Sequence, residues 1–301
     1  MGDPPITPAR SAREALYDLL VFGGRLVSLR PHLSGGWHPG ELAWSFNGDD
    51  AALQNVEFRR DAAGVVGVGS LDGGDLWVEA TPEHDRLVGD LIASAQAQAA
   101  PGAVRVRAFD DDVLRTAWLA DRNWEPVAAE GLLFAIDLTR PVPETADAAG
   151  FRVGDCVDVD IEARVRLHRE AWSALDHIGL PGVTSEFSID LYRKLRSVQL
   201  YDPSLDIIAF SPDGQMVASC IAWGDAASGV GVFEPVGVHP LYRGRRLASL
   251  VLHEGLRRLR ERGLTAAHVG TAHFNNAAAK GYSAAGFSLV GRSRWWAQSA
   301  A

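Results

Sequence analysis

The chain has 301 residues, and its 47% hydrophobic and 22% charged residues are typical of a soluble globular protein. A formal net charge of −9 disfavours nucleic acid as a partner, because phosphate binding requires a basic surface. We found no apolar run of membrane-spanning length, no signal-peptide order and only two cysteines, so we expect a cytoplasmic protein without a membrane segment, disulfide framework or metal site.

In chain order, the first half predicts a helix after residues 77–82, a turn and helix cap at 110–112, and a strand over 132–138. Residues 141–150 are polar and proline-bearing and have no regular period, so we interpret them as a linker. The flanking parts, residues 1–140 and 151–301, each have the size of one domain.

The second half predicts a regular succession of elements. It begins with a strand (151–153), helices at 160–173 and 185–198, the second capped by Ser185, and strands at 206–210, 216–223 and 229–238. A helix (245–262), a strand (266–270), a helix (276–285) and a strand (287–296) follow. Segments 77–82 and 119–124 resemble segments 235–240 and 282–287, which suggests a duplication. The alternative is a chance likeness between ordinary strand–turn–helix segments.

The turn between strand 229–238 and helix 245–262 has the composition of a phosphate-binding loop. Gly244 allows the main chain to approach a ligand, and Arg243, Arg245 and Arg246 add positive charge. The first amides of the following helix have no intrahelical partner and point toward an anion. The pattern therefore predicts a phosphate site at the start of this helix.

Residues 236–248 resemble motif A of the GCN5-related N-acetyltransferases (GNAT), whose loop reads Gln/Arg-x-x-Gly-x-Gly/Ala and binds the pyrophosphate of acetyl-CoA. Arg243 and Ala248 match its first and last positions, and Arg246 stands where the middle glycine is expected. Residues 275–287 resemble that family's Asn-x-x-Ala-x-x-x-Tyr-x-x-x-Gly-Phe. The two motifs occur in the family's order, with a helix and a strand between them.

This resemblance implies an α/β fold of two tandem GNAT-like domains, each a mixed, mainly antiparallel sheet flanked by helices. Residues 151–301 would form the catalytic domain that binds acetyl-CoA. Residues 1–140 would form a degenerate domain, because residues 82–90 carry acids and lack a glycine in the turn. The whole chain resembles tandem acetyltransferases of the mycothiol synthase type.

The resemblance also implies the residues of the site. Glu234 interrupts an apolar strand and is our candidate general base; a solvent-facing charge or a buried ion pair is the alternative, and His239 and His273 are other candidate bases. Tyr282 would protonate the departing thiolate, or else only pack. The cofactor-binding residues would be Val236, Gly237, Val238, Arg243, Gly244, Arg245, Arg246, Leu247, Ala248 and Asn275, the last of which also suits a helix cap.

We expect an N-acetyltransferase that transfers the acetyl group of acetyl-CoA to a primary amine of a small molecule, such as an amino sugar or an aminoglycoside-like metabolite, and that acts as a monomer or homodimer. Acceptor contacts would come from residues 170–188, with Trp172, Asp176, His177 and Glu186 as candidates. The alternatives are a non-catalytic acyl-CoA sensor, an enzyme for another acyl-CoA or a protein N-terminus, and a transferase using charged tRNA, which the acidic balance disfavours.

Overall fold

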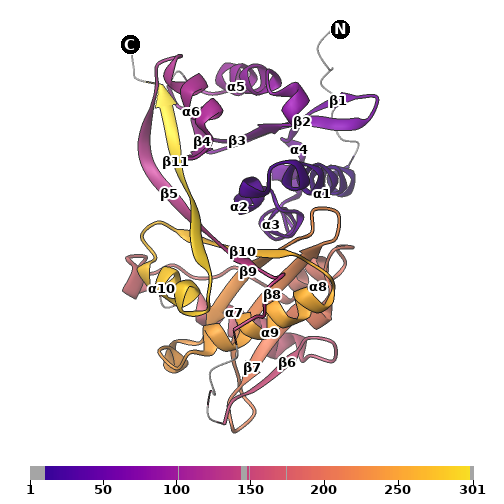
Figure 1. Ribbon diagram of the computed structural model, residues 1–301, viewed down its shortest axis with the longest axis vertical. Coiled ribbons are helices and arrows are strands. Elements are labelled where there is room, and N and C mark those ends of the chain that lie inside the picture. The colour runs from indigo at the N-terminus through magenta and orange to yellow at the C-terminus, as the bar shows by residue number, and fades with distance from the viewer. Residues whose placement is uncertain (1–10, 101, 144–147, 149, 174, 299–301) are drawn as a thin grey trace.

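The computed structural model describes residues 11–100, 102–143, 148, 150–173 and 175–298. Their strands form one 11-stranded sheet in the order β1-β2-β3-β4-β11-β5-β10-β9-β8-β7-β6, with helices packed against it (Figure 1). Among the described strands, β3–β4 and β9–β10 pair in parallel and the other neighbours pair antiparallel. The predicted α/β class, with mixed and mainly antiparallel pairing, is confirmed.

The first half begins with four helices that precede its strands. These are α1 (Ala12–Leu29), α2 (Ser34–Trp37), α3 (Pro39–Ser45) and α4 (Asp50–Gln54), followed by β1 (Glu57–Asp61), β2 (Gly64–Asp72), β3 (Asp75–Ala80), α5 (Leu87–Gln98), β4 (Arg105–Phe109), α6 (Val113–Ala120) and β5 (Trp124–Asp137). The predicted helix after residues 77–82 is α5. Asp112 caps α6 by accepting a hydrogen bond from the Arg115 amide at 3.0 Å, as expected, and β5 is longer than the predicted 132–138.

The second half follows the predicted order. It contains β6 (Arg152–Asp155), α7 (Ile161–Ala171), α8 (Ile189–Arg196), β7 (Asp206–Phe210), β8 (Met216–Asp225), β9 (Val230–Val238), α9 (Leu247–Glu261), β10 (Ala266–Ala272), α10 (Asn276–Ala284) and β11 (Ser288–Gln298). The prediction that Ser185 caps a helix is wrong. Ser188 accepts from the Leu191 amide and begins α8, while Ser185 accepts from the Phe187 amide in the preceding turn. Of the predicted linker, residues 144–147 and 149 lie outside the described residues.

The two halves share strands at the centre of the sheet. β5, the last strand of the first half, lies between β11 and β10 of the second half. β11 in turn pairs with β4 through residues 293–297. Figure 1 shows β5 and β11 running together from one half to the other. Because every one of these contacts is a main-chain ladder, the hydrogen bonding of the sheet is continuous from β1 to β6.

Helix α3 of the first half packs on the face of β8 and β9 in the second half. Ala43 of α3 belongs to the same buried cluster as Trp223 and Val232. His38, which precedes α3, lies with its Nε2 atom 3.1 Å from the Val230 carbonyl oxygen, and its Nδ1 atom accepts from the Gly40 amide at 3.0 Å. These contacts fix the position of α3 relative to β9.

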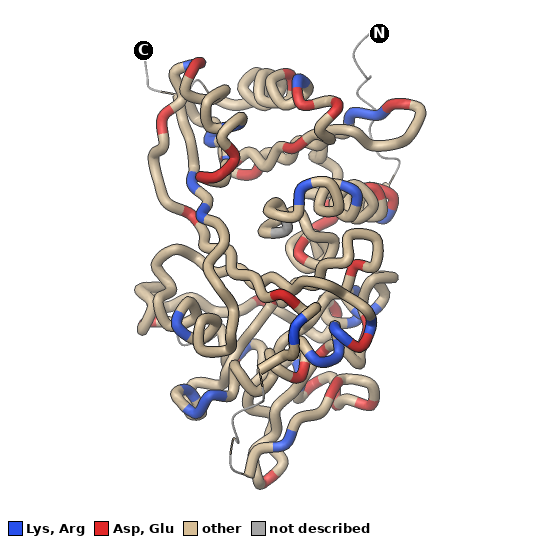
Figure 2. The backbone as a smooth tube through the Cα atoms, in the orientation of Figure 1, with Lys and Arg blue, Asp and Glu red and all other residues tan. Residues whose placement is uncertain are grey.

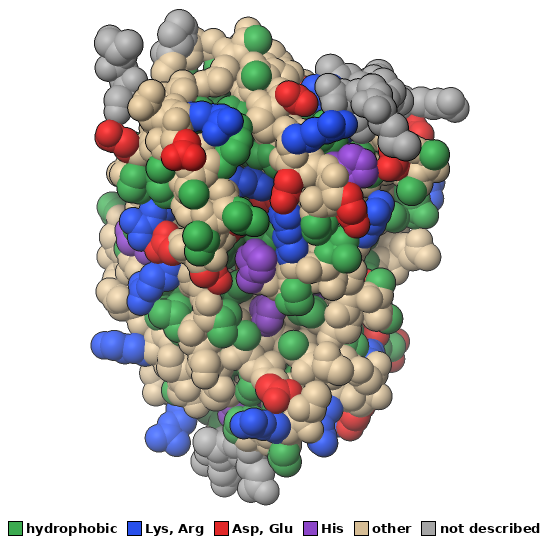
Figure 3. All heavy atoms as spheres, turned by 45° about the horizontal axis from the view of Figure 1, so that its top comes forward, with side chains coloured by type: hydrophobic (Ala, Val, Ile, Leu, Met, Phe, Trp, Pro, Cys, Tyr) green, Lys and Arg blue, Asp and Glu red, His purple; other side chains and the backbone are tan. Residues whose placement is uncertain are grey.

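The exposed surface mixes charges of both signs. Acidic and basic side chains are interspersed on the face shown in Figure 3, so the net charge of −9 is not gathered into one patch there. None of the described helices is long and apolar enough to cross a lipid bilayer.

Substituting Gly40→Ala tests the contact between α3 and β8. A β-carbon at Gly40 would lie 2.2 Å from Cβ and 2.3 Å from Cγ of Trp223, atoms that cannot swing away. We expect the free energy of unfolding to fall by about 1–3 kcal/mol, measured by urea denaturation. The matched Gly281→Ala change in α10 meets nothing within 4 Å and should be neutral or stabilising. Equal effects of the two substitutions would contradict this account of the interface.

Candidate functional site

The site is built around a split between two parallel strands. β9 and β10 pair from Val230↔Ala266 to Phe233↔Val269 and then separate. Beyond this point β10 continues along β5, and β9 continues along β8 as far as Val238. Within the described chain, the edge of β9 over residues 234–238 that faces the split therefore has no strand partner. Unpaired main-chain groups of this kind can form hydrogen bonds with an extended ligand.

The turn that follows β9 leads directly into the N-terminus of α9. After a short 3₁₀ turn (Pro240–Tyr242), Gly244 has φ +77° and Arg246 has φ +59°, and α9 begins at Leu247. Among the described side chains none caps this helix, and the Leu250 amide is the first to donate back, to the Arg246 carbonyl at 3.0 Å. The amides of the first turn are thus available to an anion.

Arg246 occupies the conformation that favours glycine. Its φ of +59° lies in the left-handed region, which costs an ordinary L-residue roughly 1–2 kcal/mol. The turn therefore keeps its shape although arginine replaces the expected glycine. Arg245 and Arg246 are both exposed at the start of α9, and Figure 2 shows basic residues gathered in this turn.

Arg243 connects the turn to the end of α7. Its guanidinium donates to the Ala171 carbonyl at 3.1 Å and lies 3.3 Å from Nδ1 of His177. Arg245 lies over the ring of Tyr242, 5.3 Å from the ring centre. Arg243 is thus anchored to the segment between α7 and α8, whereas Arg245 and Arg246 stand nearer to solvent.

Glu234 is the first residue of β9 beyond the last pair with β10. Its main-chain carbonyl accepts a hydrogen bond of 2.6 Å from the Trp223 indole, next to an irregularity in the β8–β9 register. The peptide bond from Glu234 to Pro235 is cis. Burial raises the pKa of the Glu234 carboxyl to about 7. Near neutral pH this carboxyl can therefore accept and release a proton.

Tyr282 lies on α10 in the core under the sheet. Its ring packs against Phe134 and Phe287, with centroids 5.8 Å and 6.4 Å away, so the packing role is observed. Burial, and to a lesser degree the nearby Glu234 and Cys220, raise the pKa of the phenol well above its usual value. The Tyr282 hydroxyl thus remains protonated and can donate.

The cofactor residues expected on β9 alternate between its two faces: Val236 and Val238 pack toward the α9 side, and Gly237 faces α7. Val236 and Val238 are partly buried, and a β-carbon on Gly237 would collide with the Trp172 ring at 2.1 Å. Trp172 stacks on His168 with ring centroids 4.3 Å apart. Close packing of this indole accounts for the glycine at residue 237.

The other candidates have structural contacts. Nδ1 of His239 accepts a hydrogen bond from the Leu241 amide at 3.2 Å, and its Nε2 lies 3.4 Å from a Glu170 carboxylate oxygen. The exposed His273 has its Nδ1 3.3 Å from the Glu130 carbonyl oxygen. Asn275 caps α10 through a 3.1 Å bond from the Ala278 amide. Asp176 and Glu186 are exposed and His177 contacts Arg243, so the α7–α8 segment borders the loop.

Sequence reasoning missed three charged residues that the first half contributes. Glu41 on α3 lies at the split, while Arg107 on β4 donates to Glu130 on β5 at 2.8 Å and to the Gly35 carbonyl at 2.8 Å. Burial raises the pKa of Glu41 to about 8; Glu234 and Glu130 add to the shift, and Arg107 and a hydrogen bond from Gly36 oppose it. The signal was an acid within the apolar run of α3.

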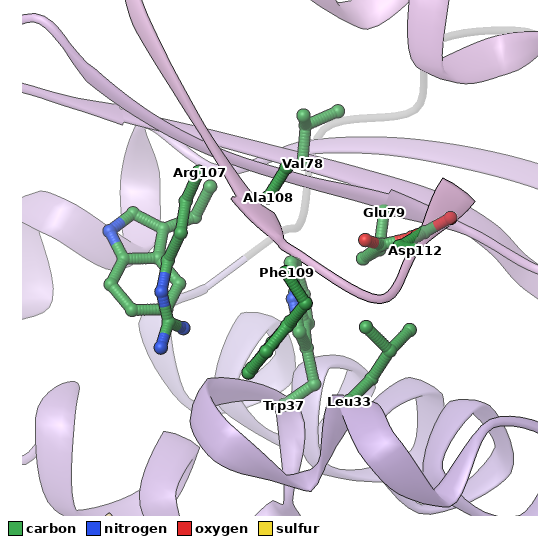
Figure 4. Close-up of a pocket in the computed structure, with 9 residues that line it drawn as sticks. Leu33, Trp37, Val78, Glu79, Arg107, Ala108, Phe109 and Asp112 are labelled. Carbon is green, nitrogen blue, oxygen red and sulfur yellow. The ribbon is translucent and has the colours of Figure 1, made fainter. Parts of the chain in front are cut away.

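Arg107 packs against aromatic rings of the first half. Its guanidinium lies 4.5 Å from the centre of the Trp77 ring and 5.1 Å from that of Phe109. Figure 4 shows Arg107 and Phe109 extending from β4 toward the side of the molecule that carries Trp37 and Leu33. The Arg107–Glu130 pair is therefore part of the packed contact between the sheet and α2.

The first half has a similar split that its own side chains fill. β3 and β4 pair at Asp75↔Arg105 and Leu76↔Val106 before they separate. Beyond that point Arg115 donates to the Val78 carbonyl at 3.3 Å and to Glu79 at 3.0 Å. The main-chain acceptor that an extended ligand would use here is already occupied.

Residues 167–287 match the model of the acetyltransferase (GNAT) family. The fold is similar to a GCN5-related N-acetyltransferase from Sphaerobacter thermophilus, with 18% identity, a TM-score of 0.57 and 97% of this chain and 94% of that chain covered. It is also similar to a tandem GNAT protein from the clavulanic acid biosynthesis pathway, with 14% identity, a TM-score of 0.62 and 97% of each chain covered.

A GNAT-family acetyltransferase from Colwellia psychrerythraea is 16% identical, with a TM-score of 0.62 and 98% of this chain and all of that one (100%) covered. No curated protein matches by sequence. At these identities the structural similarities establish the fold alone. Because the neighbours align over nearly their whole length, they support a tandem arrangement of two domains.

The raised pKa of Glu234 predicts a pH-dependent effect on stability. A carboxyl whose folded pKa lies above its unfolded value stabilises the fold below the unfolded pKa, and this contribution is lost as pH rises through about 7. Relative to the wild type, Glu234→Gln should gain about 1–2 kcal/mol between about pH 5 and pH 8, a figure reduced for partial exposure. Urea denaturation at both pH values measures it. If the difference in unfolding free energy between the variant and the wild type does not change with pH, the pKa of Glu234 is not raised by folding.

Proposed function

We propose that this chain, whose residues 167–287 form a domain of the acetyltransferase (GNAT) family, transfers the acetyl group of acetyl-CoA to a primary amine of a small molecule. The family assignment supports acyl transfer in general. The observation that carries the finer proposal is one continuous run: the open edge of β9, the Gly244–Arg246 turn and the uncapped start of α9. Such a run matches an extended thioester arm that ends in phosphates.

The cofactor would bind along this run. The amides of Leu247 and Ala248, with the side chains of Arg245 and Arg246, suit the pyrophosphate because helix N-termini and guanidinium groups both bind anions. The unpaired edge over Val236, Gly237 and Val238 suits the amide groups of pantetheine. One β9 amide would then polarise the acetyl carbonyl, which is where negative charge develops in the transition state. Asn275 can still offer its amide nitrogen while its oxygen caps α10.

Glu234 and Tyr282 would serve the two proton transfers. The amine must lose a proton before its nitrogen attacks the thioester carbon, and Glu234 accepts that proton, directly or through water. As the carbon–sulfur bond breaks, the Tyr282 hydroxyl donates to the leaving thiolate. A carboxyl with a pKa of about 7 and a phenol that stays protonated suit these opposite roles.

We assign the cofactor to the second half alone. Residues 151–301 would be the catalytic domain, and residues 1–140 a domain without a CoA loop, joined by the linker at 141–150. In the first half Arg115 occupies the Val78 carbonyl, and Glu83 and Asp85 precede α5 where phosphate would lie. Like charges there oppose an anionic ligand.

A non-catalytic acyl-CoA sensor is the second candidate, favoured by the arginine that replaces the loop glycine at residue 246. Release of free thiol with an amine panel separates the two, since a sensor binds acetyl-CoA without turnover. The likeness to mycothiol synthase, the cytoplasmic location and a monomeric or homodimeric state remain predictions.

Calorimetric titration with acetyl-CoA tests the proposed function, and we expect one site per chain. Arg246→Gly should weaken binding about fivefold through the loss of a contact worth about 1 kcal/mol. The same change should raise the free energy of unfolding by about 1 kcal/mol, because glycine tolerates the left-handed conformation. Arg140→Ala, at an exposed arginine remote from this loop, is the control for affinity. Absence of binding at millimolar acetyl-CoA would overturn the proposal, and tighter binding by Arg246→Gly would show that this arginine obstructs the loop.

Substituting Tyr282→Phe tests the acid role. The phenyl ring preserves packing against Phe134, so the Kd for acetyl-CoA should stay within about twofold while kcat falls at least tenfold, since general acids contribute about 10²–10⁴. Thiol release under saturating substrate measures kcat, with Tyr17→Phe at an exposed position as the control. Unchanged turnover would remove Tyr282 from the mechanism.

A further inference from the structure

Helix α3 of the first half brings a carboxyl group to the mouth of the β9–β10 split. An Oε1 atom of Glu41 lies 3.9 Å from the point that a β-carbon on Gly270 would occupy. Gly270 is the first residue of β10 beyond the last pair, Phe233↔Val269, just as Glu234 is the first residue of β9 beyond it. The two carboxyl groups therefore flank the point at which the strands separate.

Both carboxyl groups belong to the same face of the sheet. Phe233 and Val269 pack on the side of α9, in one buried cluster with Leu256. Val232 faces the other way and packs with Ala43 of α3. Glu234 directly follows Phe233 and Gly270 directly follows Val269, so Glu234 and the open side of Gly270 face α3; the regular alternation of β9 ends after Glu234, at the irregularity in the β8–β9 register. An acceptor on this face would meet the thioester from the side opposite to Tyr282.

The charges around Glu41 leave a surplus of acid. Its charged neighbours are Glu234 on β9, Glu130 on β5 and Arg107 on β4, and the Gly36 main chain donates a hydrogen bond to it. Arg107 is already paired with Glu130 at 2.8 Å. Among the described residues, no cation lies within 4.0 Å of the carboxylate of Glu41 or of Glu234. When both are ionised, the pair lacks a counter-charge.

Glu41 is held in place by the packing of its helix. Gly40, which precedes Glu41, lies against Trp223, and Ala43, two residues after it, is buried with Trp223 and Val232, so these residues fix α3 to the second half. Its side chain is nevertheless only partly buried. A carboxyl group that is fixed, partly accessible and opposed by a second carboxyl group is suited to a cationic ligand, because an ammonium group between them removes their mutual repulsion.

We propose that Glu41 and Glu234 together bind the ammonium group of an aliphatic primary amine, so that the first half of the chain supplies a specificity residue of the acceptor site. This inference rests on the proposed acetyl transfer. In that reaction an ammonium ion and a thioester give an amide and a thiol, and one proton is released. Glu234 accepts this proton and passes it to solvent, while the bound ammonium group favours the ionised form of Glu41, which holds the nitrogen as the carbon–nitrogen bond forms.

The test compares two amines of similar size that differ in charge, so that an effect of the amine's charge can be distinguished from an effect of its shape. Cyclohexylamine is a cation at about pH 8, where an alkyl ammonium keeps its proton, whereas aniline is neutral. We would measure the Kd of each amine by calorimetry with CoA bound, and kcat and KM from thiol release with acetyl-CoA. The variants are Glu41→Gln, which preserves size and removes the charge, and Glu125→Gln, an exposed residue of β5 that serves as the matched control.

We expect Glu41→Gln to raise Kd and KM for cyclohexylamine at least tenfold, to change those for aniline less than twofold, and to leave the Kd for acetyl-CoA unchanged. Glu125→Gln should match the wild type throughout. The inference is overturned if Glu41→Gln weakens both amines equally, if it affects neither, or if cyclohexylamine does not bind the wild type. Failure of acetyl-CoA to bind the wild type would instead overturn the proposed function.

Discussion

The separation of β9 from β10 after Phe233 and Val269 is the constraint on which the site depends. Two parallel strands that stayed paired would satisfy each other's main chain and leave nothing for a ligand. Because they separate, β9 has an unpaired edge from Glu234 to Val238. The turn after β9 leads to the N-terminus of α9, which has no side-chain cap. A thioester ligand with a phosphate end fits the chemistry of this edge, and Glu234 stands at its beginning.

The shared strands explain why the first half matters although its own split is filled. β5 lies between β10 and β11, and β11 reaches β4, so the two halves cannot move independently at this line. That arrangement keeps α3 over β9 and sets Glu41 opposite Glu234. In the first half, Arg115 makes the contacts with Val78 and Glu79 that replace a ligand. These contacts support the proposal that the second half binds the cofactor and the first half supports it.

Much of the second half could be predicted because its signals are local. Helical periodicity, the Gly244 turn and the basic residues before α9 lie within a few positions of one another. Ser185 misled the prediction of a cap because Ser188 has the same chemistry and lies three residues later. The position of β5 between β10 and β11, and the pairing of β11 with β4, were not predictable. Pairing between segments that are far apart in the chain cannot be recognised in the sequence of either segment. Glu41 had a local signal, an acid in the otherwise apolar α3, but its position beside β10 could not be predicted, because it depends on packing between distant segments.

The central claim is that the second half binds acetyl-CoA along β9 and α9 while the first half does not. Hydrogen–deuterium exchange with and without acetyl-CoA tests this directly, because newly bonded or covered amides exchange more slowly. We expect slower exchange at residues 234–238 and 244–249, with no change at residues 78–90. Protection of residues 78–90, or no protection at residues 234–249, would contradict it.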